Sequence, residues 1–148
     1  MMRMRVGRVS RAGACIVALL CLLAGNAWAN GGMTLEQVAK LRGVTTAAIS
    51  PDGNQVAYAL SVPRALGVDE DGPAWSELHV VDGSGNTRGF VTGKVNVGGV
   101  EWFADGREIA YLAKRQGDDT RKLYRIPLHG GESRAAATLK SDISSFSL

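Results

Sequence analysis

Few side chains in this sequence have the type and spacing that catalysis or metal binding requires. The two histidines, His79 and His129, are not paired with each other or with other ligands at a metal-binding spacing. Gly83-Ser84-Gly85 lacks the G-x-S-x-G spacing that exposes a nucleophilic serine. The Gly89–Val95 segment is one residue too short for a phosphate-binding loop and ends in Val where a hydroxyl is needed. We therefore expect no catalytic residue, no cofactor-binding residue and no metal ligand in this chain.

Two further groups of side chains could contact a ligand, but structural roles fit them better. The acidic run 69–71 could attract a cation or an amine, yet it lacks the alternating oxygen ligands of a calcium loop. We expect it to be a solvated loop. Trp75 and Trp102 could stack on a ligand, but large aromatic side chains at strand positions usually fill a core. We expect both tryptophans in the core.

The excess of positive charge in the chain comes from its N-terminus. The 148 residues include 17 Lys and Arg against 14 Asp and Glu, a net charge of +3. Four of the arginines lie within residues 1–11, so the remainder has 17 − 4 = 13 bases against 14 acids. A nucleic-acid-binding protein needs a basic surface in its folded part. The composition therefore argues against nucleic acid as a partner.

The N-terminal sequence predicts export. A basic start is followed by an apolar run over 14–24 and then by Ala27-Trp28-Ala29, the pattern of a secretory signal peptide over 1–29. An uncleaved membrane anchor is the alternative. Cys15 and Cys21 both lie in this segment, so the chain from Asn30 onward contains no thiol for a disulfide, a metal or a nucleophile. We expect a periplasmic or secreted protein with no membrane contact after cleavage.

The remaining chain predicts one short helix followed by strands. Residues 30–43 form a linker and helix: Thr34 and Gln37 have the spacing of a capping box, and Gly43 supplies a stop. An apolar side that includes Leu35 and Val38 predicts a packing role for this helix. After Gly43, short β-type runs alternate with Gly, Asp, Asn and Pro. The predicted strands are 45–50, 55–60, 77–81, 87–92, 99–103, 108–113, 122–128, 133–139 and a final one at 143–148.

These strands repeat in two units of four. Asp52-Gly53 and Asp105-Gly106 occupy matching turns, a shift of 105 − 52 = 53 positions, and Ala-Tyr follows each in register. A unit of about 45 residues with four short strands is typical of one β-propeller blade. The second strands, 56–60 and 109–113, are continuously apolar, which predicts burial on both faces. A sandwich of unrelated hairpins is the competing interpretation.

The predicted fold class is therefore all-β, an incomplete β-propeller over 44–148. Blade one spans 45–92, blade two 97–139, and 142–148 starts a third. Propellers close with about four to eight blades, so two blades cannot close a ring. We expect these residues to be the N-terminal piece of a longer protein; a short chain that completes a ring by self-association is the alternative.

The repeat units resemble a known family. Residues 49–58 and 77–82 resemble the WD-like propeller repeats of the prolyl oligopeptidase family of serine peptidases, although Ala104 stands where the repeat usually has Pro. The segment 33–42 resembles the opening of exported bacterial members related to acylaminoacyl and dipeptidyl peptidases. This resemblance implies a downstream α/β-hydrolase domain with the Ser, Asp and His of a triad, and a propeller that admits only short peptides. Alone, this chain would gate substrate access and hydrolyse nothing.

Two other interpretations remain open. The periplasmic translocation protein TolB carries similar Ser-Pro-Asp-Gly repeats, so a non-enzymatic periplasmic propeller that binds protein partners is an alternative. A module that only assembles, with no ligand, is another. The matching turns and strands of the two units specify the repeat more closely than they specify the family.

Overall fold

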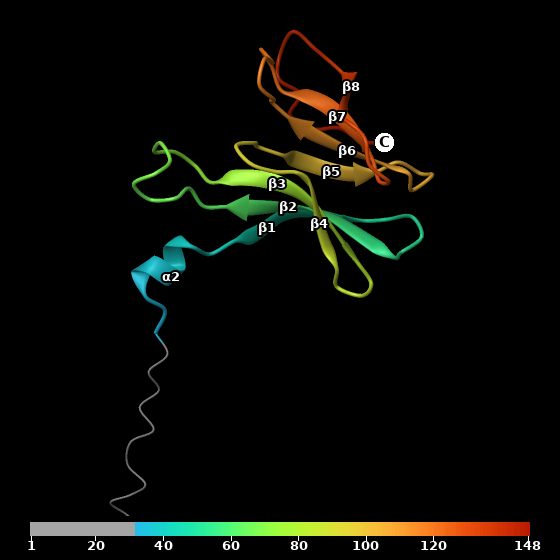
Figure 1. Ribbon diagram of the computed structural model, residues 1–148. Coiled ribbons are helices and arrows are strands. Elements are labelled where there is room, and N and C mark those ends of the chain that lie inside the picture. The colour runs from blue at the N-terminus through green and yellow to red at the C-terminus, as the bar shows by residue number, and fades with distance from the viewer. Residues whose placement is uncertain (1–31) are drawn as a thin grey trace, which may run out of the picture. The chain divides into compact units, whose positions relative to one another are not determined.

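The structure is a computed structural model that describes residues 32–148. The predicted signal peptide and both cysteines lie outside the described residues. Within them, one short helix precedes eight strands in two antiparallel sheets (Figure 1). Sheet A has the order β1-β2-β3-β4 and sheet B the order β5-β6-β7-β8, so each strand pairs with the next along the chain. No helix in the described part is long and apolar enough to cross a membrane.

All eight strands of the two predicted units are present, with ends within two residues of those predicted. Sheet A contains β1 (Gly43–Ile49), β2 (Gln55–Val62), β3 (Trp75–Asp82) and β4 (Thr87–Val91). Sheet B contains β5 (Gly98–Trp102), β6 (Glu108–Ala113), β7 (Lys122–Pro127) and β8 (Arg134–Ala137). The all-β prediction is therefore confirmed at the level of two four-stranded antiparallel sheets.

The first hairpin of each sheet closes through the same turn chemistry. In sheet A, the Asp52 carboxylate accepts hydrogen bonds from Ser50 Oγ at 2.6 Å and from the Asn54 backbone N–H at 3.2 Å. In sheet B, Asp105 accepts the Arg107 backbone N–H at 3.0 Å. The glycine after each aspartate has a positive φ of 73° or 66°, a conformation that other residues adopt only at a cost. The repeated Asp-Gly pair therefore produces the same reversal of chain direction in the first hairpin of each sheet.

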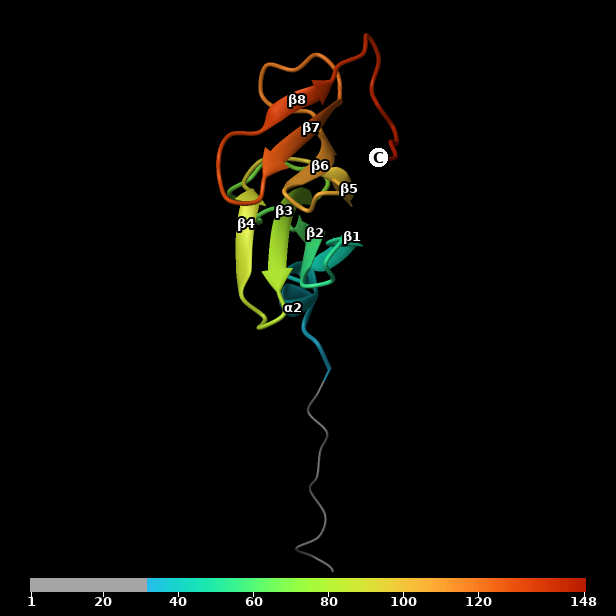
Figure 2. The ribbon, with the colours of Figure 1, turned by 90° about the vertical axis from the view of Figure 1, so that its right-hand side faces the viewer.

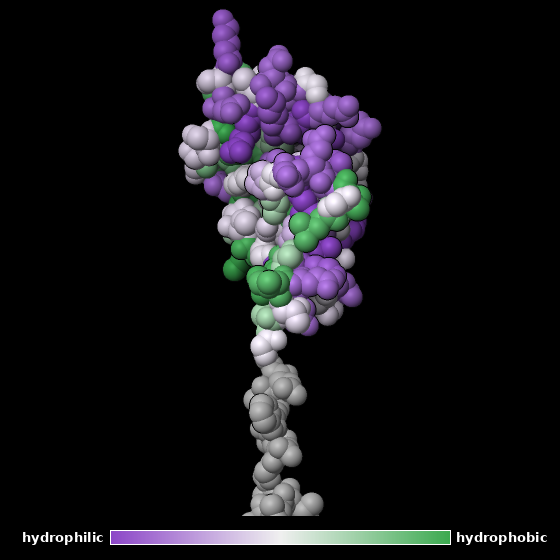
Figure 3. Space-filling view, turned by 90° about the vertical axis from the view of Figure 1, so that its left-hand side faces the viewer, coloured by the Kyte–Doolittle hydropathy of each residue, from purple (hydrophilic) through white to green (hydrophobic). Residues whose placement is uncertain are grey.

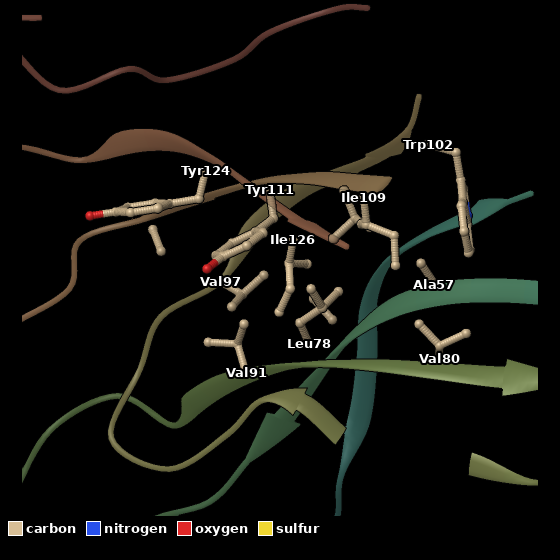
Figure 4. Close-up of a cluster of buried hydrophobic side chains, with 13 residues drawn as sticks. Ala57, Leu78, Val80, Val91, Val97, Trp102, Ile109, Tyr111, Tyr124 and Ile126 are labelled. Atoms are coloured by element: carbon tan, nitrogen blue, oxygen red, sulfur yellow. The ribbon is translucent and has the colours of Figure 1, made fainter. Parts of the chain in front are cut away.

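The core lies between the two sheets. On β2 and β3, Ala57 pairs with Val80 and Ala59 with Leu78, so these side chains share the face of sheet A that is turned toward sheet B. The facing side of sheet B contributes Val100, Trp102, Ile109, Tyr111, Tyr124 and Ile126. Figure 4 shows the two sets of side chains pointing toward each other. Trp102 also donates its Nε1–H to the Ala48 carbonyl of β1 at 2.9 Å, which ties the sheets together.

The prediction that both strands are buried on both faces is correct for β6 and wrong for β2. In β6 every residue after Glu108 is buried, including Ala110 and Leu112 on the outward face of sheet B. In β2 only Ala57 and Ala59 are fully buried. The outward side chains of β2 are half-exposed because no other part of the described chain covers that face of sheet A.

The helix forms as predicted but does not pack. Helix α2 (Leu35–Ala39) has the full capping box: Thr34 Oγ1 accepts the Gln37 N–H at 3.2 Å, and Gln37 Oε1 accepts the Thr34 N–H at 2.9 Å. The helix ends at Ala39 with Lys40 as its C-cap, and Gly43 begins β1 instead of stopping the helix. None of its residues is buried, and Leu35 is 90% exposed. The predicted packing role is therefore wrong within the described residues.

The strand predicted over 143–148 is not formed. No strand of the described chain pairs with this segment. Instead, it lies against the outward face of sheet B, where the Ile143 N–H donates to the Arg121 carbonyl at 3.0 Å. A Cβ added to Gly99 would lie 3.1 Å from the Phe146 ring and 3.5 Å from Leu112. Figure 2 shows the segment running from the end of β8 toward the level of β5.

We predict that Trp102→Phe lowers the free energy of unfolding by about 1.5 kcal/mol, because it removes the hydrogen bond to Ala48 and leaves a small void. Urea unfolding followed by circular dichroism measures this change. Trp75→Phe is the matched control, since the Trp75 Nε1–H is buried without an acceptor and its removal breaks no hydrogen bond. Equal losses in the two variants would contradict the assigned role of the Trp102 hydrogen bond.

Candidate functional site

A groove opens between the two sheets at the edge where their hairpin turns lie. It consists of two adjoining hollows of about 310 and 360 Å³ that share Gln55, Leu128 and His129. The turn before β2 and the turn before β6 meet here, since Pro51 lies against Gly106. On the other side, Arg88 of β4 donates to the Leu128 carbonyl beyond β7. We call this feature the turn-side groove.

Gln55 places an unused acceptor in the turn-side groove. Its backbone is fixed to the turn, because its N–H donates to Ser50 Oγ at 2.9 Å and its carbonyl accepts the Ser50 N–H at 2.8 Å. Its side-chain Oε1 is buried and has no hydrogen-bond partner among the described residues. A buried acceptor without a partner costs about 1–3 kcal/mol. The groove can therefore accept an N–H or O–H group at this point.

The carboxylates beside the turn-side groove already accept hydrogen bonds from residues of their own turns. Hydrogen bonds from the Ser50 hydroxyl and from Asn54 lower the pKa of Asp52. Hydrogen bonds from the side chain and backbone of Asn86 lower the pKa of Asp82. Both carboxylates stay ionised, but their oxygens shape the turns and do not act as bases. The groove offers binding groups without a pair of groups suited to proton transfer.

The structure places the two histidines apart. His129 lines the turn-side groove, whereas His79 lies on the outward face of sheet A. There the His79 ring stacks on Tyr58 with centroids 5.7 Å apart, and its Nε2 lies 3.0 Å from Glu77 Oε2. Burial raises the pKa of Glu77, but hydrogen bonds from the Gly93 N–H and from His79 outweigh it and lower the pKa overall. No hydrogen bond joins either histidine to a serine or threonine hydroxyl in residues 32–148.

The acidic connection between β2 and β3 is more ordered than a solvated loop. Arg64 donates from Nε to the Pro73 carbonyl and from Nη1 to the Glu70 carbonyl, both at 2.8 Å. Asp69 accepts the Ala65 N–H at 2.9 Å. Glu70 and Asp71 are exposed, as the sequence predicts. The solvated interpretation is therefore correct for two of the three acidic residues, while Asp69 helps to close the loop.

The two tryptophans have different environments. Trp102 is 8% exposed and belongs to the core, as predicted. Trp75 is half-buried on the outward face of sheet A, where the Arg64 guanidinium lies 3.9 Å from its ring centroid. The core prediction for Trp75 is wrong, because a cation and not a second sheet covers its ring. Sequence position alone does not distinguish the two faces of a strand whose residues are apolar on both.

One charged cluster was not expected from the sequence. Asp118 accepts hydrogen bonds from Lys122 Nζ at 2.6 Å, from the Tyr124 hydroxyl at 2.5 Å and from the Arg115 N–H at 2.8 Å. These bonds from Lys122 and Tyr124 lower the pKa of Asp118 from 3.8 to about 2. Burial and the neighbouring carboxylate raise the pKa of Tyr124 to about 12. The only sequence signal was the four-residue spacing of Asp118 and Lys122 in a loop rich in charge.

The side-chain types that ligate metal ions are dispersed over the described part of the chain. Within residues 32–148, no group of three or more His, Asp or Glu side chains is placed to hold a metal ion. Ser84 remains in a hairpin turn, where its backbone N–H donates to Asp82 at 2.9 Å. The residues of the rejected phosphate loop, 89–95, belong to β4 and the connection that follows it.

Comparison with known proteins finds a distant relative among the peptidases. Dipeptidyl-peptidase 5 of Porphyromonas endodontalis is 30% identical to this chain over 107 residues, which cover 64% of this chain and 15% of that protein. No family model matches the chain. The chain spans about 15% of the length of the curated relative it matches. The similarity, together with the all-β structure, supports a peptidase-related origin for this chain.

We predict that Asp118→Asn lowers the free energy of unfolding by roughly 2 kcal/mol at pH 7, because it removes charge-assisted hydrogen bonds. The folded pKa of Asp118 is lower than its unfolded value, so its contribution is complete above pH about 4 and is lost as pH falls through about 2. Urea unfolding of both proteins between pH 2 and 7 tests this. The exposed Asp71→Asn is the control. A difference from the parent chain that stays constant down to pH 2 would contradict the prediction.

Proposed function

We propose that this chain is the N-terminal propeller segment of an exported serine peptidase, with the two sheets as consecutive blades. The observation that carries the proposal is a repeated stacking geometry. Sheet B meets sheet A through β5, whose Trp102 side chain donates to Ala48. The C-terminal segment lies against the other face of sheet B, where the Leu148 backbone N–H donates to the Glu101 side-chain Oε2 at 2.9 Å.

The two contacts occupy equivalent positions in the repeat. Glu101 follows Ala48 by 101 − 48 = 53 positions, the same shift that relates the two Asp-Gly turns. Leu148 takes the place of Trp102, and Phe146 the place of Val100. We propose that residues 142–148 lead into the first strand of a further sheet. This position supports an array that continues past the second sheet.

The outward face of sheet A supports a neighbour on the other side. Ile49 is 69% exposed there and Val44 is 59% exposed, beside the half-exposed Val56, Tyr58 and Leu60. Globular proteins rarely leave several apolar side chains gathered on one sheet face in water. A closed ring of blades would cover this face with the last blade and so remove both exposed ends of the array.

In this proposal the chain forms part of the propeller, and the catalytic groups belong to another domain of the full-length protein. A downstream α/β-hydrolase domain would supply the triad, and the propeller would limit access to short peptides. The distant similarity to a dipeptidyl peptidase supports this assignment. We place the protein in the periplasm or the medium because of the signal peptide pattern over 1–29. The chain by itself is proposed to be inactive.

A fluorophosphonate probe tests the catalytic part of the proposal, because it labels activated serine nucleophiles covalently. We predict that the full-length exported product is labelled and cleaves short peptides, and that residues 30–148 expressed alone are neither labelled nor active. Heat-denatured full-length product is the control for nonspecific labelling. A folded full-length product that is not labelled and cleaves no peptide would contradict the proposal and favour a TolB-like binding propeller.

A further inference from the structure

A second hollow, away from the turn-side groove, has the features of a small-molecule site. It measures about 620 Å³ and lies between helix α2 and the connection that follows β2. This volume is within the range of ligand pockets in proteins. Figure 3 shows the side of the molecule that carries α2 and this connection, where apolar and charged side chains lie next to one another. We call this hollow the α2 pocket.

The walls of the α2 pocket are largely apolar. Val62, Pro63 and Ala65 line one side, and Ala39 of the helix lines the other. Leu66 also lines it and is 85% exposed, which is unusual for a leucine beside a concave surface. A ligand that covers Leu66 would remove apolar surface from water and so gain free energy. The pocket therefore favours a ligand with an apolar body.

The charges around the α2 pocket favour an anionic ligand. Its lining contains Lys40, Arg42 and Arg64 against the single acid Glu36, so the sum is 3 − 1 = 2 positive charges. Lys40 pairs with Glu36 at 2.6 Å. Arg64 is committed to two backbone carbonyls and to the Trp75 ring. Arg42 forms no hydrogen bond or ion pair within residues 32–148.

Neighbouring acids do not satisfy Arg42. Glu77 is close enough for the charge of Arg42 to lower its pKa slightly, but its two oxygens are bound by His79 and by the Gly93 N–H. Asp69 binds the Ala65 N–H and lies 3.4 Å from Lys94. An arginine with no committed partner beside an apolar pocket is suited to bind a carboxylate through two parallel N–H groups.

We propose that the α2 pocket binds an apolar molecule that ends in a single carboxylate, and specifically the free C-terminal residue of a peptide with an apolar side chain. Arg42 would bind the carboxylate, while Val62, Ala65 and Leu66 would contact the side chain. Lys40 would add charge at the rim. The inference does not depend on the proposed peptidase function, because it requires binding at this pocket and no reaction.

Isothermal titration calorimetry of the full chain tests this inference with three probes: acetyl-Ala-Leu as the free acid, its C-terminal amide, and octanoate. We expect the free acid to bind and the amide to bind at least about tenfold more weakly, a difference of about 1.4 kcal/mol. We expect Arg42→Gln to weaken binding of the free acid by a similar factor. Arg134→Gln, an exposed arginine on β8 that lies outside both the α2 pocket and the turn-side groove, is the matched control and should leave binding unchanged.

Each other outcome of the titration overturns all or part of the inference. Equal affinity for acid and amide, or unchanged binding by Arg42→Gln, would exclude a carboxylate at Arg42. Binding of octanoate without binding of the peptide acid would assign the pocket to an alkyl carboxylate and exclude a peptide C-terminus. Absence of binding by all three probes up to ~10 mM would exclude the site. Circular dichroism of each variant verifies that it is folded.

Discussion

The apolar contact between the two sheets is the interaction on which the rest of this structure depends. Ala57, Leu78 and their neighbours on sheet A meet Ile109, Tyr111 and Ile126 on sheet B, and this contact excludes water from both. Because each sheet is a simple meander, no strand crosses from one to the other. The two sheets are therefore held together by side-chain packing, by the hydrogen bond from the Trp102 indole and by contacts between turns.

Most of the polar chemistry in the described chain stabilises loops and turns. Asp52 and Asp82 bind N–H groups of their own turns, Arg64 binds carbonyls of its own loop, and Asp118 joins a loop to β7. Charged groups committed in this way are poor candidates for catalysis, since a reaction would have to break the bonds that order the loop. Two groups without a hydrogen-bond partner in residues 32–148, the Gln55 side-chain oxygen and the Arg42 guanidinium, line hollows and so favour binding. This distribution of polar groups agrees with the proposal that the segment binds ligands and carries no catalytic groups.

The strand order was predictable because two local signals agreed: turn residues with defined geometry, and a repeat that placed the same turn twice. Trp102 was predictable because it occupies a repeated strand position. The sequence could not show which outward faces would be covered, since burial depends on neighbours that lie far away in the chain or beyond it. This explains why β2, Trp75 and α2 are more exposed than predicted. The Asp118 cluster was missed because its members lie in a loop and a strand, where no periodic pattern relates them.

The central proposal is that these sheets are the first blades of a longer propeller. The most direct measurement is the intact mass of the endogenous product, captured from the exported fraction with an antibody against residues 34–148 and analysed by mass spectrometry. The account predicts a product several times larger than this chain, because the apolar outward face of sheet A is exposed and two blades cannot close a ring. An endogenous product no longer than this chain, with no larger species in the exported fraction, would contradict it.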